Sequence, residues 1–166
     1  MRILPADRRL RLTVACDGAA RGNPGPAGGG VSLTDERGEV VAEIAEGIGV
    51  ATNNVAEYTA AIRGLERARD LGAAEVLLRS DSRLLVEQLS GRFKVKNPTL
   101  QRLHAQARAL AAGFEGVRYE HVPRERNTEA DRLANVGVDT WLAGEGATWT
   151  RSDPPPRLWG AEEGSR

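Results

Sequence analysis

The sequence is poor in cysteine, histidine and aromatic residues, and each shortage excludes a class of protein. A single cysteine among 166 residues, Cys16, rules out an internal disulfide and fits a reducing compartment. With only two histidines beside it, a structural zinc site is not expected. Aromatic residues make up 4% of the chain, so a core must be built from Leu, Val, Ile and Ala.

An excess of charge and a long apolar run are missing as well. The 23 basic and 23 acidic residues balance, so a polyanionic partner would need a local patch rather than the field of the whole molecule. No apolar stretch reaches about 18 residues, and the start MRILPADRRLRL lacks the apolar centre of a signal peptide. We therefore expect a single-domain, monomeric, cytoplasmic protein with no membrane partner.

Hydrophobic periodicity predicts the order β-β-β-α-β-α-α-β-α. Residues 10–16 alternate like a half-buried strand, and residues 29–47 read as a hairpin around the turn Asp35–Gly38. Further strands are predicted at 74–81 and 116–122, and helices at 53–72, 82–91, 97–113 and 128–142. This order predicts an α/β fold with a mixed five-stranded sheet, three antiparallel strands and then two parallel ones, flanked by helices.

Three stretches lack such a pattern. Residues 1–9 are predicted to be an N-terminal tail, and residues 24–30, rich in Gly and Pro, a connecting turn. Residues 143–166, which contain SDPPPR, are predicted to be a flexible tail. The folded domain is therefore expected at 10–142.

Four acids lie at the predicted ends of elements. Asp17 and Asp81 close strands, whereas Glu57 and Asp131 lie in the first turns of helices. By strand parity, Asp17 and Asp81 both leave on the less apolar face, so parallel neighbouring strands would bring their carboxylates together. Because close like charges repel, such a set favours a bound cation, and carboxylates without Cys or His suit Mg²⁺ or Mn²⁺.

Each acid also has a purely structural interpretation. Glu57 and Asp131 could complete the capping-box patterns N-V-A-E and T-E-A-D. Asp17 could open a turn, and Asp81 could begin a helix. The four together favour a ligand site, because all are expected at one edge of the sheet.

Four segments resemble the type 1 ribonuclease H family, in its short bacterial and archaeal branch. They are DGAARGNPGPAGGGV, TNNVAEYTAAIRGL, LRSDSRLLVEQLSGRFKVKNP and VPRERNTEADRLAN, in order and on the expected elements. The resemblance covers residues 10–142 and implies an endonuclease that hydrolyses the RNA strand of RNA–DNA hybrids with two divalent metal ions. It further implies that Asp17 bridges both ions, that Glu57 and Asp81 hold one, and that Asp131 holds the other.

The resemblance also implies contacts with nucleic acid. The backbone of Gly18 and the side chain of Asn23 would lie near the RNA strand, whose 2′-hydroxyls distinguish it from DNA. Residues near the sugars and phosphates of the two strands would be Thr52, Asn53 and Asn54. For the two asparagines, helix capping is the alternative role.

One departure from the family lies in the loop before the last acid. Many members carry a histidine there, whereas the loop VPRERNTEA has none and contains Arg124. We expect Arg124 to approach the scissile phosphate or to help the product leave; the alternative is a surface arginine paired with Glu125 or Glu129. His121, in the preceding strand, is expected to be packed or hydrogen-bonded.

A local cationic run could grip phosphates on this otherwise neutral chain. No acid occurs between Gln88 and Phe114, and the cations there are Arg92, Lys94, Lys96, Arg102 and Arg108. A solvated helix face and loop is the alternative.

We therefore expect a metal-dependent ribonuclease H. The alternative is a non-catalytic domain that binds RNA–DNA hybrids or double-stranded RNA, against which the intact set of four acids speaks. Integrases and resolvases share such acid clusters, but GNPG and TNN favour ribonuclease H. A phosphatase is disfavoured because no D-x-D motif is present.

Overall fold

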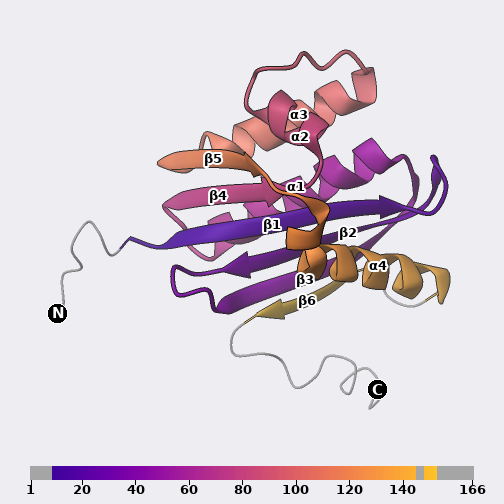
Figure 1. The fold of residues 1–166 in the computed structure, drawn as a ribbon, viewed down its shortest axis with the longest axis horizontal. Coiled ribbons are helices and arrows are strands. Elements are labelled where there is room, and N and C mark those ends of the chain that lie inside the picture. Colours follow the sequence, from indigo (N-terminus) through magenta and orange to yellow (C-terminus); the bar gives the residue numbers. More distant parts are fainter. Residues whose placement is uncertain (1–8, 145–147, 153–166) are drawn as a thin grey trace.

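The computed structural model describes residues 9–144 and 148–152, which form one sheet with helices on both faces (Figure 1). The predicted tail at 1–9 lies almost entirely outside the described residues. The strands are β1 (Arg11–Ala20), β2 (Gly25–Thr34), β3 (Val40–Ala51), β4 (Glu75–Ser80), β5 (Gly116–His121) and β6 (Thr148–Ser152). The helices are α1 (Asn53–Asp70), α2 (Arg83–Leu89), α3 (Pro98–Ala111), the short 3₁₀ helix η2 (Arg124–Arg126) and α4 (Thr128–Leu142).

The sheet has the strand order β5-β4-β1-β2-β3-β6. β1, β2 and β3 pair antiparallel, whereas β4 pairs parallel with both β1 and β5. The predicted mixed sheet of three antiparallel and two parallel strands is therefore confirmed. In the part of the chain that the structure describes, no helix is both long enough and apolar enough to cross a membrane.

A sixth strand extends the sheet beyond the prediction. β6 pairs antiparallel with the outer edge of β3, from Ala42 opposite Ser152 to Glu46 opposite Thr148. The flexible tail predicted at 143–166 is thus wrong for residues 148–152, while residues 153–166 lie outside the described residues. Periodicity does not identify this five-residue strand, because it forms by pairing with the free N–H and C=O groups of a sheet edge.

The Gly- and Ala-rich stretch that follows Asp17 is strand rather than loop. β1 continues to Ala20, and β2 already begins at Gly25, so that Asp17 pairs with Gly30. The predicted turn at 24–30 is therefore wrong, as is the placement of Asp17 at the end of its strand.

The glycines of β2 allow the helices to pack closely against the sheet. A Cβ on Gly30 would lie 2.2 Å from the carbonyl oxygen of Ala130, and one on Gly28 would lie 2.4 Å from that of Ala134. Gly29, between them, faces Ala60 of α1 instead. Since successive residues of a strand face opposite sides, α4 and α1 cover opposite faces of the sheet, as Figure 1 shows.

The main core lies on the face that α1 covers. Side chains from β1 alternate toward it and meet the apolar face of α1; the buried members of these two elements include Leu12, Val14, Cys16, Tyr58, Ile62 and Leu65. Asp17 has the opposite parity and therefore points to the α4 side. Asn97 caps α3, because its Oδ1 accepts from the Leu100 N–H at 3.0 Å.

Candidate metal centre

Asp17 and Asp81 come from neighbouring parallel strands. The register of β1 and β4 runs from Arg11 opposite Glu75 to Ala15 opposite Arg79, and Asp81 follows β4 directly. Continued by two residues, this register places the two acids side by side, as the parallel-neighbour prediction required. Asp81 does not begin α2, because Ser82 is the N-cap of that helix.

Glu57 completes a group of three carboxylates. One carboxylate oxygen from each of Asp17, Glu57 and Asp81 lies within 4.8 Å of the other two. Glu57 lies in the second turn of α1, not the first, because Thr52 is the N-cap. Its Oε1 accepts from the Gly18 N–H at 3.0 Å, so the capping-box interpretation is wrong and the side chain is aimed at β1.

Asp131 lies beside this group rather than within it. It is in the first turn of α4 as predicted, and that helix has no side-chain cap hydrogen bond, so the T-E-A-D capping box is not formed. Asp131 lines the same cleft as the other three acids and shares a side-chain hydrogen bond with Asp17. The structure therefore brings all four predicted acids together, three tightly and one at the side.

Burial and mutual repulsion dominate the electrostatics of the cluster. Asp17 is only 4% exposed. Its burial, together with the charges of Glu57 and Asp81, raises the pKa of Asp17 to about 9. Burial and Asp81 raise the pKa of Glu57 to about 8, against the lowering effects of the Gly18 N–H and of Arg124. Without a cation, the cluster therefore holds protons at neutral pH.

The donor set fits a hard divalent cation. The clustered ligands are all carboxylate oxygens, the donors that Mg²⁺ and Mn²⁺ prefer. Cys16, although adjacent in sequence, is buried on the other face, where its Sγ lies 3.6 Å from the carbonyl oxygen of Arg79. Positive charge placed among the acids would remove the repulsion that now raises their pKa values.

Arg124 lines the cleft that the acids form, whereas His121 lies outside it. Arg124 lines the cleft from η2 and acts electrostatically on Glu57. Within the described residues, the ion pair of Glu129 is made by Arg132 rather than by Arg124. Two roles were expected for His121, packing or hydrogen bonding; its side chain is exposed at the end of β5, so the first of them is wrong.

The predicted nucleic-acid contacts divide between two clefts. The acid cleft, of about 440 Å³, is lined by the four acids and by Gly18, Ala19, Ala20, Arg21, Asn53, Arg124 and Asn135. A second cleft, of about 270 Å³, lies between the starts of α1 and α3 and is lined by Asn23, Thr52, Asn54, Val55, Asn97, Thr99 and Leu100. The sequence analysis therefore predicted residues of both clefts, but it did not predict that the start of α3 lines the second one.

Several of these side chains already have a structural role. Thr52 Oγ1 accepts from the Val55 N–H at 3.2 Å and caps α1. Asn23 Oδ1 accepts from the Asn53 N–H at 3.0 Å, so the β1–β2 turn is tied to the start of the same helix. The capping role considered for Asn53 and Asn54 thus belongs to Thr52, and both asparagine side chains are exposed.

Two buried polar residues that sequence reasoning missed connect elements of the fold, Asn127 at the acid site and Gln88 beneath the loop between α2 and α3. Asn127 is 2% exposed, and its Nδ2 donates to the carbonyl oxygen of Cys16 at 2.9 Å, which ties the start of α4 to the strand that carries Asp17. Gln88 accepts from the Tyr58 hydroxyl at 2.6 Å and donates to the carbonyl oxygen of Lys94 at 3.1 Å. Asn127 could have been found from the sequence, because it directly precedes a predicted helix. No local pattern indicates the role of Gln88.

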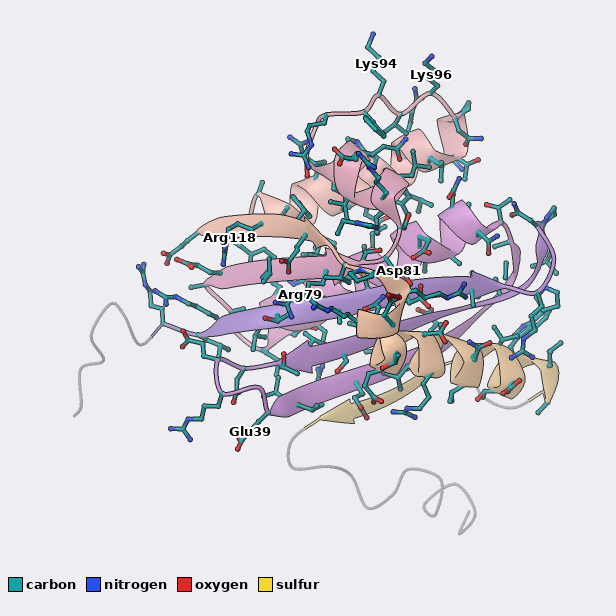
Figure 2. All side chains as sticks on the ribbon, viewed as in Figure 1. Glu39, Arg79, Asp81, Lys94, Lys96 and Arg118 are labelled. Carbon is teal, nitrogen blue, oxygen red and sulfur yellow. The ribbon has the colours of Figure 1, made fainter. Side chains whose placement is uncertain are left out.

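The cationic run surrounds the loop between α2 and α3. Figure 2 shows Lys94 and Lys96 projecting from this loop away from the sheet. Arg92 is paired with Glu87, and Arg108 donates to the carbonyl oxygen of Leu89 at 3.4 Å. The exposed side chains of Lys94, Lys96 and Arg102 are therefore the more available charges for a phosphate.

Comparison with known proteins places the chain in a family. Residues 15–137 match the family described as Reverse transcriptase-like. The bifunctional protein Rv2228c of Mycobacterium tuberculosis is 53% identical over 131 residues, covering 78% of this chain and 36% of that protein. The solved N-terminal RNase H domain of Rv2228c superposes with a TM-score of 0.79 at 50% identity, covering 81% of this chain and 98% of the other.

Two further relatives are themselves type 1 ribonucleases H. Ribonuclease HI of Halobacterium salinarum is 45% identical over 137 residues, covering 82% of this chain and 69% of that protein. LC11-RNase H1, solved in complex with an RNA/DNA hybrid, gives a TM-score of 0.76 at 43% identity, covering 79% of this chain and 99% of the other. The chain belongs to the type 1 ribonuclease H family.

Proposed function

We propose that this chain is a metal-dependent endoribonuclease that hydrolyses the RNA strand of RNA–DNA hybrids. The observation that carries the proposal is the cluster of Asp17, Glu57 and Asp81, with ligand oxygens within 4.8 Å of one another, in a type 1 ribonuclease H chain. The hybrid bound to the related LC11-RNase H1 supports the choice of substrate. The chain spans only 36% of the length of the first curated relatives, so the activity is proposed for this domain.

The acids would hold two divalent cations, Mg²⁺ or Mn²⁺. Asp17 is central, because its carboxylate lies within 4.8 Å of those of Glu57 and Asp81 and shares a side-chain hydrogen bond with Asp131. When bound, such cations supply positive charge for the phosphate oxygens and lower the pKa of a coordinated water. In the reaction a water oxygen bonds to phosphorus, the bond to the 3′ oxygen breaks, and a proton passes from the water side to the leaving side.

The protein's own groups orient the acids and the substrate. The Gly18 N–H fixes Glu57, and Asn127 fixes the start of α4, so Asp131 and Asp17 keep their relative positions. Arg124 adds a cation that can donate to the phosphate but cannot act as a base. The second cleft offers hydroxyl and amide groups for the sugar–phosphate backbone, which sequence-independent binding requires.

Cleavage of a labelled hybrid with Mg²⁺, Mn²⁺ or EDTA tests the proposal. We expect cutting of the RNA strand with either metal, none with EDTA, and a loss of at least about 100-fold in Asp81→Asn. Asp70→Asn, an exposed acid at the end of α1 paired with Arg69, is the matched control and should cut normally.

Binding of the hybrid without metal-dependent cutting would instead support the non-catalytic alternative. Double-stranded RNA assayed in parallel shows whether the domain accepts a second kind of duplex.

A further inference from the structure

Arg21 is a cation at the acid cleft that the proposed mechanism does not use. It follows β1 directly, at the turn into β2, and its side chain is 42% exposed. Arg21 and Arg124 are the two cations among the residues that line the cleft. Arg124 acts on Glu57, whereas Arg21 stands on the side of α4.

Contacts with α4 hold the Arg21 side chain in place. Its Nη2 donates to Asn135 Oδ1 at 3.1 Å, and its Nη1 lies 2.8 Å from Asp139 Oδ1. Asn135 Nδ2 donates in turn to the carbonyl oxygen of Asp131 at 3.0 Å. Because Asp131, Asn135 and Asp139 are spaced by four residues, they form one stripe along the helix. The guanidinium is therefore fixed one turn away from a metal-binding acid.

This arrangement leaves donors available for an anion. A guanidinium carries five N–H groups, and the contacts with Asn135 and Asp139 occupy two of them. Its planar fork matches two oxygens of a phosphate. Stability does not explain the arrangement, because an ion pair whose acid side chain is 66% exposed contributes little to the free energy of folding.

We propose that Arg21 binds a backbone phosphate of the strand that lies over the four acids, next to the phosphate that is cut. The inference rests on the proposed function and adds a phosphate subsite to the same cleft. Asn135 and Asp139 orient the guanidinium, and its remaining N–H groups donate to the phosphate oxygens. Such a contact reads no base, so it strengthens binding of the hybrid regardless of sequence.

The test is hybrid binding in an Asp81→Asn background, with a fluorescently labelled hybrid, Mg²⁺ and a series of salt concentrations. Arg21→Gln should weaken binding about tenfold near 0.1 M salt and reduce the salt dependence by about one phosphate contact. Arg37→Gln, an exposed arginine on the turn between β2 and β3, is the matched control and should change neither quantity.

A second variant distinguishes a phosphate contact from a structural tie. Asp139→Ala removes one of the two contacts and a negative charge beside the phosphate, but keeps the cation and its hydrogen bond to Asn135, so it should bind the hybrid at least as tightly as the background protein. Equal weakening by Arg21→Gln and Asp139→Ala, with lowered unfolding temperatures, would show a structural tie and overturn the proposal. An unchanged affinity and salt dependence in Arg21→Gln would overturn it too.

Failure of the proposed function is seen separately. In that case, the protein with Asp81 intact does not cut the hybrid in Mg²⁺ or Mn²⁺, whether or not it binds it, whereas failure of the Arg21 proposal leaves metal-dependent cutting in place.

Discussion

At the scale of single residues, the candidate site opposes the stability of the protein that contains it. Asp17 and Glu57 are held where burial and neighbouring acids make ionisation costly. In an unfolded chain both would ionise near pH 4. The folded protein without metal therefore binds more protons than the unfolded chain between about pH 4 and pH 9.

Because the folded state holds the extra protons, the free energy of unfolding of the metal-free protein should fall as pH rises from about 4 to about 9. Asp17→Asn removes one of these groups, so it should stabilise the metal-free protein by roughly 1–2 kcal/mol at pH 8 and have little effect at pH 4. The same variant should not cut hybrid.

Urea unfolding in EDTA at several pH values measures this difference. Asp70→Asn serves again as the control, since that acid is exposed and remote from the cluster. A variant at Asp17 that is less stable than the parent at pH 8 would contradict the electrostatic account.

Many members of the family carry a histidine in the loop before the last acid, whereas this chain carries Arg124 there. Its place beside Glu57 predicts that Arg124→Ala lowers turnover of hybrid about tenfold, the effect of losing one charge-assisted hydrogen bond. Arg126→Ala, from the same 3₁₀ turn but outside the acid cleft, should cut normally. Single-turnover cleavage at saturating Mg²⁺ is the measurement, and full turnover in Arg124→Ala would exclude the role.

At the scale of elements, the glycines of β2 determine where α4 lies. Gly30→Ala would place a Cβ 2.2 Å from the Ala130 carbonyl oxygen, so α4 would have to move away from the sheet. We expect a destabilisation of about 1–3 kcal/mol, the usual cost of overpacking, and weaker cleavage because Asp131 moves with the helix.

Gly116→Ala provides the matched control for this substitution. A Cβ on Gly116 would meet no atom within 4 Å, so the change should alter the free energy of unfolding by less than about 0.5 kcal/mol. Thermal unfolding and cleavage assays of the two variants check the prediction. Equal stability of both would show that α4 accommodates the methyl group without cost.

The same glycines explain why the helices and strands were predicted more accurately than the residues at which they begin and end. Periodicity identified α1 and α4, because their apolar faces repeat along the helix and are buried as expected. Gly28 and Gly30 carry no such signal, because the backbone that they approach closely, at Ala134 and Ala130 of α4, is far along the chain. Locally they resemble a turn.

The acids were predictable for a different reason. Strand parity and parallel pairing fixed the approach of Asp17 to Asp81. The tie made by Asn127 and the stripe that holds Arg21 depend on tertiary contacts that no local pattern reveals.

At the scale of the whole molecule, β6 covers an edge of the sheet. Removal of residues 145–166 would expose the unpaired backbone groups of β3, which can pair with another copy. We expect the full chain to be monomeric and this truncated form to associate as its concentration rises. Light scattering after size-exclusion chromatography measures the difference.

A shorter truncation isolates the contribution of β6. Removing only 153–166 keeps the strand, so this form should remain monomeric. Association of both truncated forms to the same extent would contradict a role for β6 at the edge.

The late position of Asp131 in the chain has a consequence for synthesis. Three of the four acids precede residue 82, so a growing chain contains the cluster of Asp17, Glu57 and Asp81 while α4 has yet to leave the ribosome. The fourth acid joins them only when α4 settles on the bare backbone of β2. Completion of the cleft therefore requires α4 to pack on β2, and a chain interrupted before α4 would contain the three clustered acids without the fourth.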